Sequence, residues 1–186
     1  MRPNQEVIRT ARSLVAVALV AAAEALCQER QAGNCSPQRR IVISIPDRKL
    51  ALIENGRVVK IYPTAVGAEA TPSPAGSFTI VHRIPNPAWY GAGKTVPAGR
   101  NNPLGTRWLG LSRKSYGIHG TNAPSSIGRN ASHGCIRMRN RDVEELFEMV
   151  ALGDVVELRG ERDAELAQIF GAVQTIAAAA NAGGGQ

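Results

Sequence analysis

KLALIENGRVVKIY, residues 49–62, is the stretch that decides the fold class. Two runs rich in aliphatic and β-branched residues, 49–54 and 57–67, flank the dipeptide Asn55-Gly56. Both residues of that dipeptide accept a positive φ angle, which a two-residue hairpin turn requires. The segment therefore predicts a β-hairpin.

Similar runs predict that strands make up most of the domain. Further strands are expected at 40–45, 77–83, 107–111, 116–120 and 154–158. Residues 140–150 instead have a helical period, with apolar residues at i, i+3, i+4 and i+7 from Val143. Asn140 is the expected N-cap of this helix, and Gly153 is expected to end it. We expect a mainly β fold, a sandwich or open barrel of mixed strands with one packed helix.

A proline- and glycine-rich stretch, residues 84–106, separates two of these strands. Its part at 85–93 is expected to form no regular structure. Long loops in compact domains are often lids or binding loops. Trp89 and Tyr90, at the centre of this loop, are therefore expected to close over a substrate. The alternative for Trp89 is that it covers the edge of the core.

Composition limits the classes of partner. The chain has 186 residues and a formal net charge of +7, which favours anionic surroundings or serves solubility alone. It contains no arginine-rich helix, aromatic stacking stripe or zinc-finger spacing, so we expect no nucleic-acid partner. Aromatic residues make up only 4% of the chain, so the core must consist mainly of aliphatic side chains.

The first 25 residues have the order of a secretory signal. Residues 1–12 carry three arginines against one acid, residues 13–23 are uncharged, and the small residues Ala23 and Ala25 lie at the end. This order predicts a cleaved signal peptide at 1–25 and therefore export. The alternative is an uncleaved membrane anchor.

The remaining chain divides into three parts. We expect a linker at 26–39, a catalytic domain at 40–158, and a C-terminal segment at 159–186 with a helix from 163 to 180 and a flexible end. Cys27 and Cys35 lie in the linker, where an oxidising compartment would allow them to form a disulfide. Cys135 would then be the only free thiol.

The chemistry is concentrated in residues 119–138, which hold Cys135 and two of the three histidines. A free thiol has a pKa of about 8.5 and needs activation to act as a nucleophile. An imidazole can take its proton, and a nearby Arg137 would lower its pKa or hold a substrate anion. Gly134 allows unusual backbone angles, and N–H groups around it could stabilise an oxyanion. These are the parts of an acyl-transfer site.

Five motifs in order carry a resemblance to a known family: TPSPAGSF at 71–78, NPLGTR at 102–107, HGT at 119–121, SHGCIRM at 132–138 and NRDV at 140–143. Over residues 40–158 the sequence closely resembles the catalytic domain of YkuD-type L,D-transpeptidases, especially the ErfK-like branch of Gram-negative bacteria. The first motif has one residue more than the corresponding turn of the family.

The resemblance implies a YkuD-like β-sandwich or open barrel whose helix follows the catalytic motif. It implies a periplasmic enzyme that attacks a peptidoglycan tetrapeptide stem, releases D-alanine and holds a thioester. An amine then takes the acyl group. That amine belongs either to another stem, giving a 3→3 cross-link, or to an outer-membrane lipoprotein. We expect no cofactor and no metal, and the sequence does not indicate an oligomeric state.

The resemblance also implies roles for single residues. Cys135 would be the nucleophile and His119 the general base, with the Gly120 carbonyl orienting the imidazole. His133 is the alternative base. His133 and Gly134 would flank the thiol and shape the oxyanion site. Four side chains are expected to support the site or bind substrate: Ser132 beside His133, Arg137 on a carboxylate, and Tyr116 and Trp89 along the cleft.

Two rival functions differ in class from this one. A zinc hydrolase would use His119, His133 and Cys135 as ligands, although the spacing of His133 and Cys135 is poor for zinc. A non-catalytic wall-binding module would keep the fold without the chemistry. Retention of the whole His and Cys constellation disfavours the second rival.

Overall fold

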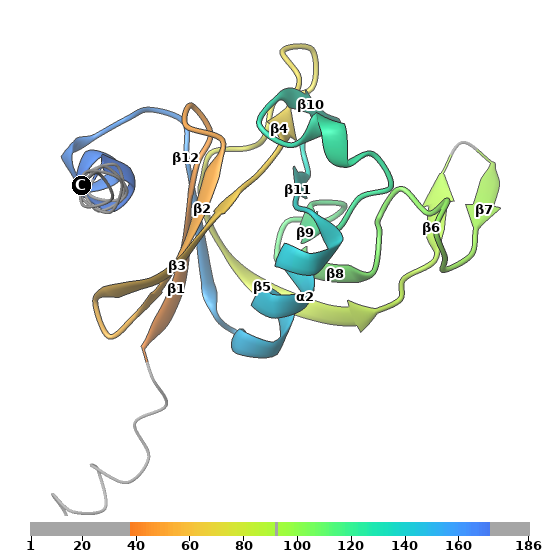
Figure 1. Ribbon diagram of the computed structural model, residues 1–186, viewed down its shortest axis with the longest axis horizontal. Coiled ribbons are helices and arrows are strands. Elements are labelled where there is room, and N and C mark those ends of the chain that lie inside the picture. The colour runs from red at the N-terminus through yellow and green to blue at the C-terminus, as the bar shows by residue number, and fades with distance from the viewer. Residues whose placement is uncertain (1–37, 92, 172–186) are drawn as a thin grey trace, which may run out of the picture. The chain divides into compact units, whose positions relative to one another are not determined.

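The computed structural model describes residues 38–91 and 93–171 (Figure 1). Eight strands form one mixed sheet: β1 (Arg39–Ser44), β2 (Lys49–Glu54), β3 (Arg57–Pro63), β5 (Gly76–Pro85), β8 (Arg107–Leu111), β9 (Gly117–His119), β11 (Ile136–Arg137) and β12 (Val155–Arg159). Their order is β11-β9-β8-β5-β12-β1-β2-β3. The β1–β12 and β9–β11 pairs are parallel and the others antiparallel. The expected mainly β fold of mixed strands is confirmed.

The hairpin predicted at Asn55-Gly56 joins β2 to β3. Both residues have positive φ angles, 50° and 75°, and Glu54 pairs with Arg57 across the turn. The strand expected at 57–67 is interrupted, because β3 ends at Pro63. The chain then enters β4 (Val66–Gly67), which pairs in parallel with β10 (Asn130–Ser132). β4 thus connects the main sheet to the segment that leads into SHGCIRM.

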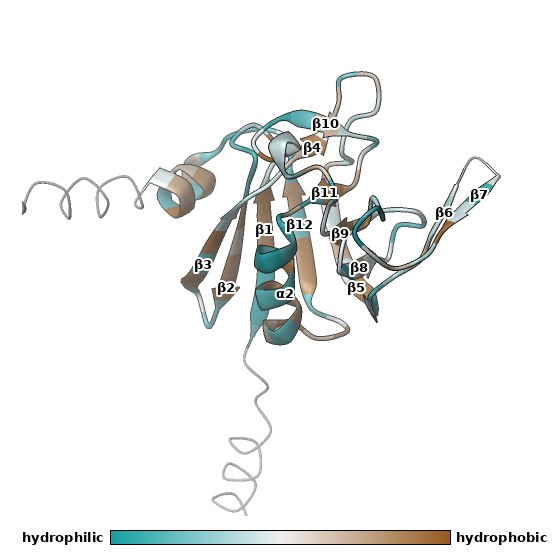
Figure 2. Ribbon diagram, turned by 45° about the vertical axis from the view of Figure 1, so that its right-hand side comes forward, coloured by the Kyte–Doolittle hydropathy of each residue, from teal (hydrophilic) through white to brown (hydrophobic). Residues whose placement is uncertain are grey.

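Both faces of β1 and β2 are buried, because alternate residues of each strand belong to different apolar clusters. On one face Ile41 and Leu50 pack in the main core with side chains of α2 (Asn140–Met149). On the other face Val42 packs with Leu166 from a helical segment at 164–171. Each such fully buried aliphatic side chain contributes about 1.5–3 kcal/mol. Figure 2 shows mainly apolar colouring along β2 and the upper part of β1, and both hydrophilic and apolar colouring along α2.

The expected helix at 140–150 is present, but both of its expected ends are wrong. The N-cap is Arg139 rather than Asn140, and the last helical residue is Met149, four positions before Gly153. The Asn140 side chain has another partner, because its Oδ1 accepts a hydrogen bond from the Thr121 backbone N–H at 3.0 Å. Asn140 therefore ties the start of α2 to the chain just after β9.

Residues 85–93 were expected to form no regular structure, and this expectation is wrong. β5 extends to Pro85, where it pairs with Arg107, and a separate hairpin follows with strands β6 (Trp89–Gly91) and β7 (Lys94–Val96). Regular structure is possible here because the prolines lie at strand ends or outside the strands. Gly93, with φ of 71°, accommodates the turn. A short 3-10 helix, η1 (Pro124–Ser126), was also unforeseen.

Several expectations fall outside the described residues: the signal peptide at 1–25, all but the end of the linker at 26–39, the pairing of Cys27 with Cys35, and the tail beyond 171. The described helical residues 164–171 lie within the helix expected at 163–180. In the described part of the chain, every helix falls short of the length and hydropathy that a membrane span requires.

Candidate active site

The Ser132-His133-Gly134-Cys135 turn lies between β10 and β11 and is closed by one buried hydroxyl. Ser132 Oγ donates to the Cys135 carbonyl oxygen at 2.5 Å and accepts from the Gly134 backbone N–H at 3.0 Å. The Ser132 side chain was expected to support His133 or contact substrate. Its hydroxyl is instead engaged within the turn, which makes it a positioning group for the cysteine backbone.

Gly134 is required at its position by both conformation and space. Its φ angle is 104°, which favours glycine. A Cβ atom there would lie 2.7 Å from Cε1 of Tyr116 and 3.3 Å from the Pro72 carbonyl oxygen. Tyr116 was expected to line the cleft, but its ring packs against Gly134 and is not among the side chains that line the cavity. The two residues fix the turn from one side.

His119 is the last residue of β9 and lies between two neighbouring strands. Its backbone pairs with Trp108 of β8 and with Arg137 of β11, and its ring stacks on the Trp108 indole with centroids 5.6 Å apart. Nδ1 lies 2.6 Å from the Gly120 carbonyl oxygen. Because a carbonyl can only accept, Nδ1 carries the hydrogen and Nε2 keeps its lone pair. The Gly120 carbonyl thus fixes the tautomer that a base needs.

Burial lowers the pKa of His119 to about 4. The charge of Arg137 acts in the same direction, whereas hydrogen bonding to the backbone of Gly120 and Leu104 raises the pKa. The imidazole is therefore neutral at neutral pH. In this state Nε2 can accept a proton.

The thiol of Cys135 is half-buried and points toward a backbone carbonyl, with Sγ 3.6 Å from the Ser115 oxygen. Burial raises its pKa, while a backbone hydrogen bond with Gly117 and the charge of Arg137 lower it. Arg137 lowers the thiol pKa, as expected from the sequence, but the opposite effect of burial is larger. The resting thiol is therefore protonated, and attack on a carbonyl needs a base to remove its proton.

A cavity of about 330 Å³ brings the candidate residues together. It is lined by Trp89, Pro103, Leu104, His119, Ser132, His133, Cys135 and Arg137. The first three form an apolar wall, and the others provide the nucleophile, both imidazoles and one guanidinium. Gly120, Gly134 and Tyr116 support these side chains without lining the cavity.

The backbone N–H groups of the turn are not equally available to an oxyanion. The Gly134 N–H is already bound to Ser132 Oγ. Within the described residues, no partner is found for the N–H groups of His133 and Cys135. Of the N–H groups around Gly134 that were expected to stabilise an oxyanion, that of Gly134 itself is therefore occupied. His133 and Cys135 are the available donors.

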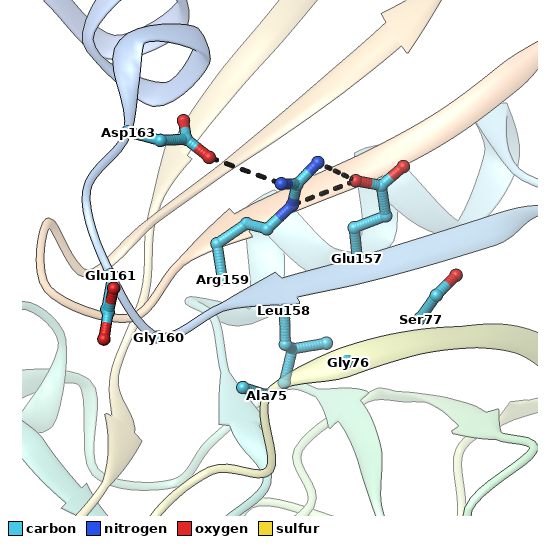
Figure 3. Close-up of a pocket in the computed structure, with 9 residues that line it drawn as sticks. All are labelled: Ala75, Gly76, Ser77, Glu157, Leu158, Arg159, Gly160, Glu161 and Asp163. Atoms are coloured by element: carbon cyan, nitrogen blue, oxygen red, sulfur yellow. Dashed lines mark hydrogen bonds and ion pairs between the residues drawn. The ribbon is translucent and has the colours of Figure 1, made fainter.

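A larger hollow of about 540 Å³ lies elsewhere, at the start of β5 and the end of β12 (Figure 3). Its main charged group, Arg159, is bound to Glu157 at 2.5 Å and to Asp163 at 3.3 Å. No cysteine or histidine lines this hollow. It therefore lacks the groups for acyl transfer, although it is the larger of the two.

Within the described ranges, no three His, Cys, Asp or Glu side chains are arranged to share a metal ion. His119, His133 and Cys135 line the same cavity, but they do not form such a group. The zinc hydrolase alternative is not favoured by this arrangement.

The model of the YkuD family, the L,D-transpeptidase catalytic domain, matches residues 38–158. The chain belongs to this family. It is 49% identical over 119 residues to a putative L,D-transpeptidase YkuD of Bacillus licheniformis, covering 64% of each chain. It is 34% identical over 134 residues to the probable L,D-transpeptidase ErfK/SrfK of Salmonella typhimurium, covering 63% of this chain and 43% of that protein.

The fold agrees with this membership. An L,D-transpeptidase structure from Mycobacterium smegmatis superposes with a TM-score of 0.58 at 19% identity, covering 67% of this chain and 60% of that one. This likeness shows a shared fold. The chain spans less than two thirds of the length of either curated relative named above.

No role was assigned from the sequence to one residue that holds this cavity together, although it lies in the NPLGTR motif. Asn102 is fully buried, and its Nδ2 donates to the carbonyls of Pro87 at 2.8 Å and of Val96 and Pro97 at 3.1 Å. Its Oδ1 accepts from the Leu104 N–H at 2.8 Å. A single amide thus joins both ends of the β6–β7 hairpin to the apolar wall of the cavity.

We expect Asn102→Ala to destabilise the domain by about 1–3 kcal/mol, because buried polar groups would lose their partner. The acylation rate should fall as well, since Trp89 and Leu104 would lose their common anchor. Urea unfolding and the rate of acyl-enzyme formation measure the two effects. Asn101→Ala is the matched control, because its side chain is exposed and it should change stability by less than about 0.5 kcal/mol. Equal urea midpoints for the two variants would contradict the role of Asn102.

Proposed function

We propose that this protein is a peptidoglycan L,D-transpeptidase with Cys135 as nucleophile and His119 as general base. The observation that carries the proposal is that a protonated thiol and a neutral imidazole line the same cavity. Fixation of the Nδ1–H tautomer by Gly120 leaves Nε2 as the proton acceptor. Membership of the L,D-transpeptidase family supports the reaction type.

In the first half-reaction, Nε2 of His119 takes the thiol proton as Sγ of Cys135 attacks the carbonyl carbon of the donor's L,D amide. The carbonyl oxygen becomes an oxyanion, for which the N–H groups of Cys135 and His133 are the available donors. As the intermediate collapses, the C–N bond breaks and the imidazolium gives its proton to the departing D-alanine amine. The products are free D-alanine and a thioester on Cys135.

In the second half-reaction, an amine attacks the thioester carbonyl and passes a proton through His119 to the sulfur. The new amide leaves, and the thiol is restored. An amine of a diamino acid on a second stem would give a 3→3 cross-link, and a lysine of an outer-membrane lipoprotein would give an attached lipoprotein. Both acceptors fit the same thioester, and both are retained in the proposal.

The remaining site residues receive supporting roles. Trp89 would pack against the donor from the apolar part of the cavity lining, and Arg137, which also lines the cavity, would bind its carboxylate. Tyr116 and Gly134 would hold the turn, and Ser132 would fix the Cys135 carbonyl.

We place the enzyme in the periplasm, with residues 1–25 as its export signal and an uncleaved inner-membrane anchor as the alternative. The catalytic domain would occupy 40–158, after a linker at 26–39. Residues 159–186 would provide the C-terminal helix and tail. The basic start and uncharged run before residue 24 support the signal.

The decisive experiment is intact-protein mass spectrometry after incubation with a tetrapeptide stem. The expected adduct has the mass of the donor less one alanine, and it should disappear when a diamino acceptor is added. By resemblance to the family, a carbapenem should also form one adduct on Cys135. A protein that binds peptidoglycan but forms neither adduct would be the non-catalytic module instead. Activity lost on chelation would support the zinc alternative.

A further inference from the structure

Charges are unevenly distributed along this chain. Residues 70–141 contain no Asp or Glu, yet they contain ten Lys or Arg residues: Arg83, Lys94, Arg100, Arg107, Arg113, Lys114, Arg129, Arg137, Arg139 and Arg141. The acid-free segment runs from the loop before β5 to the start of α2. It therefore includes β5, β8, β9, β11, the β6–β7 hairpin and the whole lining of the catalytic cavity.

The ion pairs show the same division. Among the described residues, only Arg139 and Arg141 of the ten cations lie within 4 Å of an acid, and both share Asp142. Outside the segment, by contrast, Arg39 and Arg40 each contact two acids. The other eight cations of the acid-free segment therefore have no carboxylate of the described chain within 4 Å. The resulting positive field attracts anions and raises their local concentration.

Two of these cations lie on the turn that contacts the nucleophile. Arg113 and Lys114 are exposed, and the next residue, Ser115, provides the carbonyl 3.6 Å from Sγ of Cys135. The Arg113 guanidinium carbon lies 5.0 Å from the centre of the Tyr116 ring. That ring packs against Gly134 of the catalytic turn. Its contact with the Tyr116 ring thus holds Arg113 near the catalytic turn.

We propose that the turn at 112–116 is an anion subsite that binds carboxylates of the donor stem. The enzyme would then select stems with free carboxylates over amidated stems. The proposal rests on the proposed function and defines its substrate class. Amidation removes the negative charge of a carboxylate but keeps its shape and size. Binding through Arg113 and Lys114 would respond to that charge, whereas packing on Trp89 and Leu104 would not.

The test compares two tetrapeptide donors that differ only in amidation of their side-chain carboxylates. We expect the free donor to have a kcat/KM about fourfold higher at low salt, with about twofold from each cation. The preference should shrink at 0.2 M salt, where the screening length is below about 8 Å. Equal kcat/KM for the two donors at low salt would overturn the subsite.

Variants assign the preference to the turn. Lys114→Gln should remove about half of the preference on a logarithmic scale, and Arg113→Gln with Lys114→Gln should remove nearly all of it. Arg57→Gln is the matched control, since it removes one exposed cation from β3, outside the acid-free segment. Lys114→Gln also keeps the contact of Arg113 with Tyr116, so a loss of preference there cannot come from the turn unfolding. An equal loss in Arg57→Gln would assign the effect to net charge and overturn the subsite.

The two proposals fail in different ways. A thioester that forms at the same rate from free and amidated donors contradicts the subsite and leaves the transpeptidase assignment standing. No thioester from either donor contradicts the transpeptidase assignment itself.

Discussion

Cys135→Ala should abolish acyl-enzyme formation, because it removes the one thiol that lines the cavity, and the Ser132 hydroxyl there is already engaged within the turn. The thiol makes only weak sulfur hydrogen bonds, to the backbone of Ser115 and Gly117, so its loss should leave the fold intact. We expect the donor adduct in mass spectrometry to fall below detection while the thermal unfolding midpoint stays within a few degrees of the original. Turnover that persists in this variant would refute the mechanism.

A matched control separates the nucleophile from its surroundings. Ser132→Ala keeps the thiol but removes the hydroxyl that joins the Cys135 carbonyl to the Gly134 N–H. This variant should still form the adduct, at a reduced rate, because the turn loses two stabilising hydrogen bonds but keeps its reactive thiol. The two variants together distinguish chemistry from positioning.

His119→Gln should lower the acylation rate constant by about 10²- to 10⁴-fold, the usual contribution of a positioned base. Gln fills similar space but cannot take the thiol proton. His133→Gln should have a much smaller effect, because the His133 ring is exposed and is not held by a neighbouring carbonyl as His119 is by Gly120. Single-turnover kinetics with the same donor measures both. The reverse ranking would make His133 the base.

The pH dependence provides a second check on the base. The pKa of His119 is lowered to about 4, so the protonated, inactive imidazole accumulates only as pH falls toward 4. The acylation rate should therefore be flat from about pH 5 to 8 and fall below that range. In His119→Gln only the thiolate that forms without a base can react. Because the pKa of the Cys135 thiol is raised, the thiolate fraction, and with it the acylation rate, should rise about tenfold per pH unit over the same range. Parallel profiles for the two proteins would exclude His119 as base.

The elements that the sequence predicted well are those fixed by local chemistry. The hairpin at Asn55-Gly56 needs only two residues with positive φ between two apolar strands, and α2 needs only its own period. The candidate cysteine and histidines stood out because reactive residue types were clustered in one short segment. Their roles, however, came from resemblance to a family.

The features that were missed depend on partners far away in the chain. β4 and β10 are only two and three residues long, so no period reveals them, and they exist because they pair with each other. Asn102 binds carbonyls of residues that precede it by five, six and fifteen positions. The dominance of burial over Arg137 in setting the thiol pKa also required the fold.

The position of β12 in the sheet has a consequence for when the domain can fold during synthesis. β12 lies between β1 and β5, so it joins the strand that begins the domain to those that carry the nucleophile and base. Until residues 155–159 have left the ribosome, the two halves lack the strand that bridges them. The main sheet can therefore close only after β12 has been synthesised, so cooperative folding of this domain must follow translation of that strand.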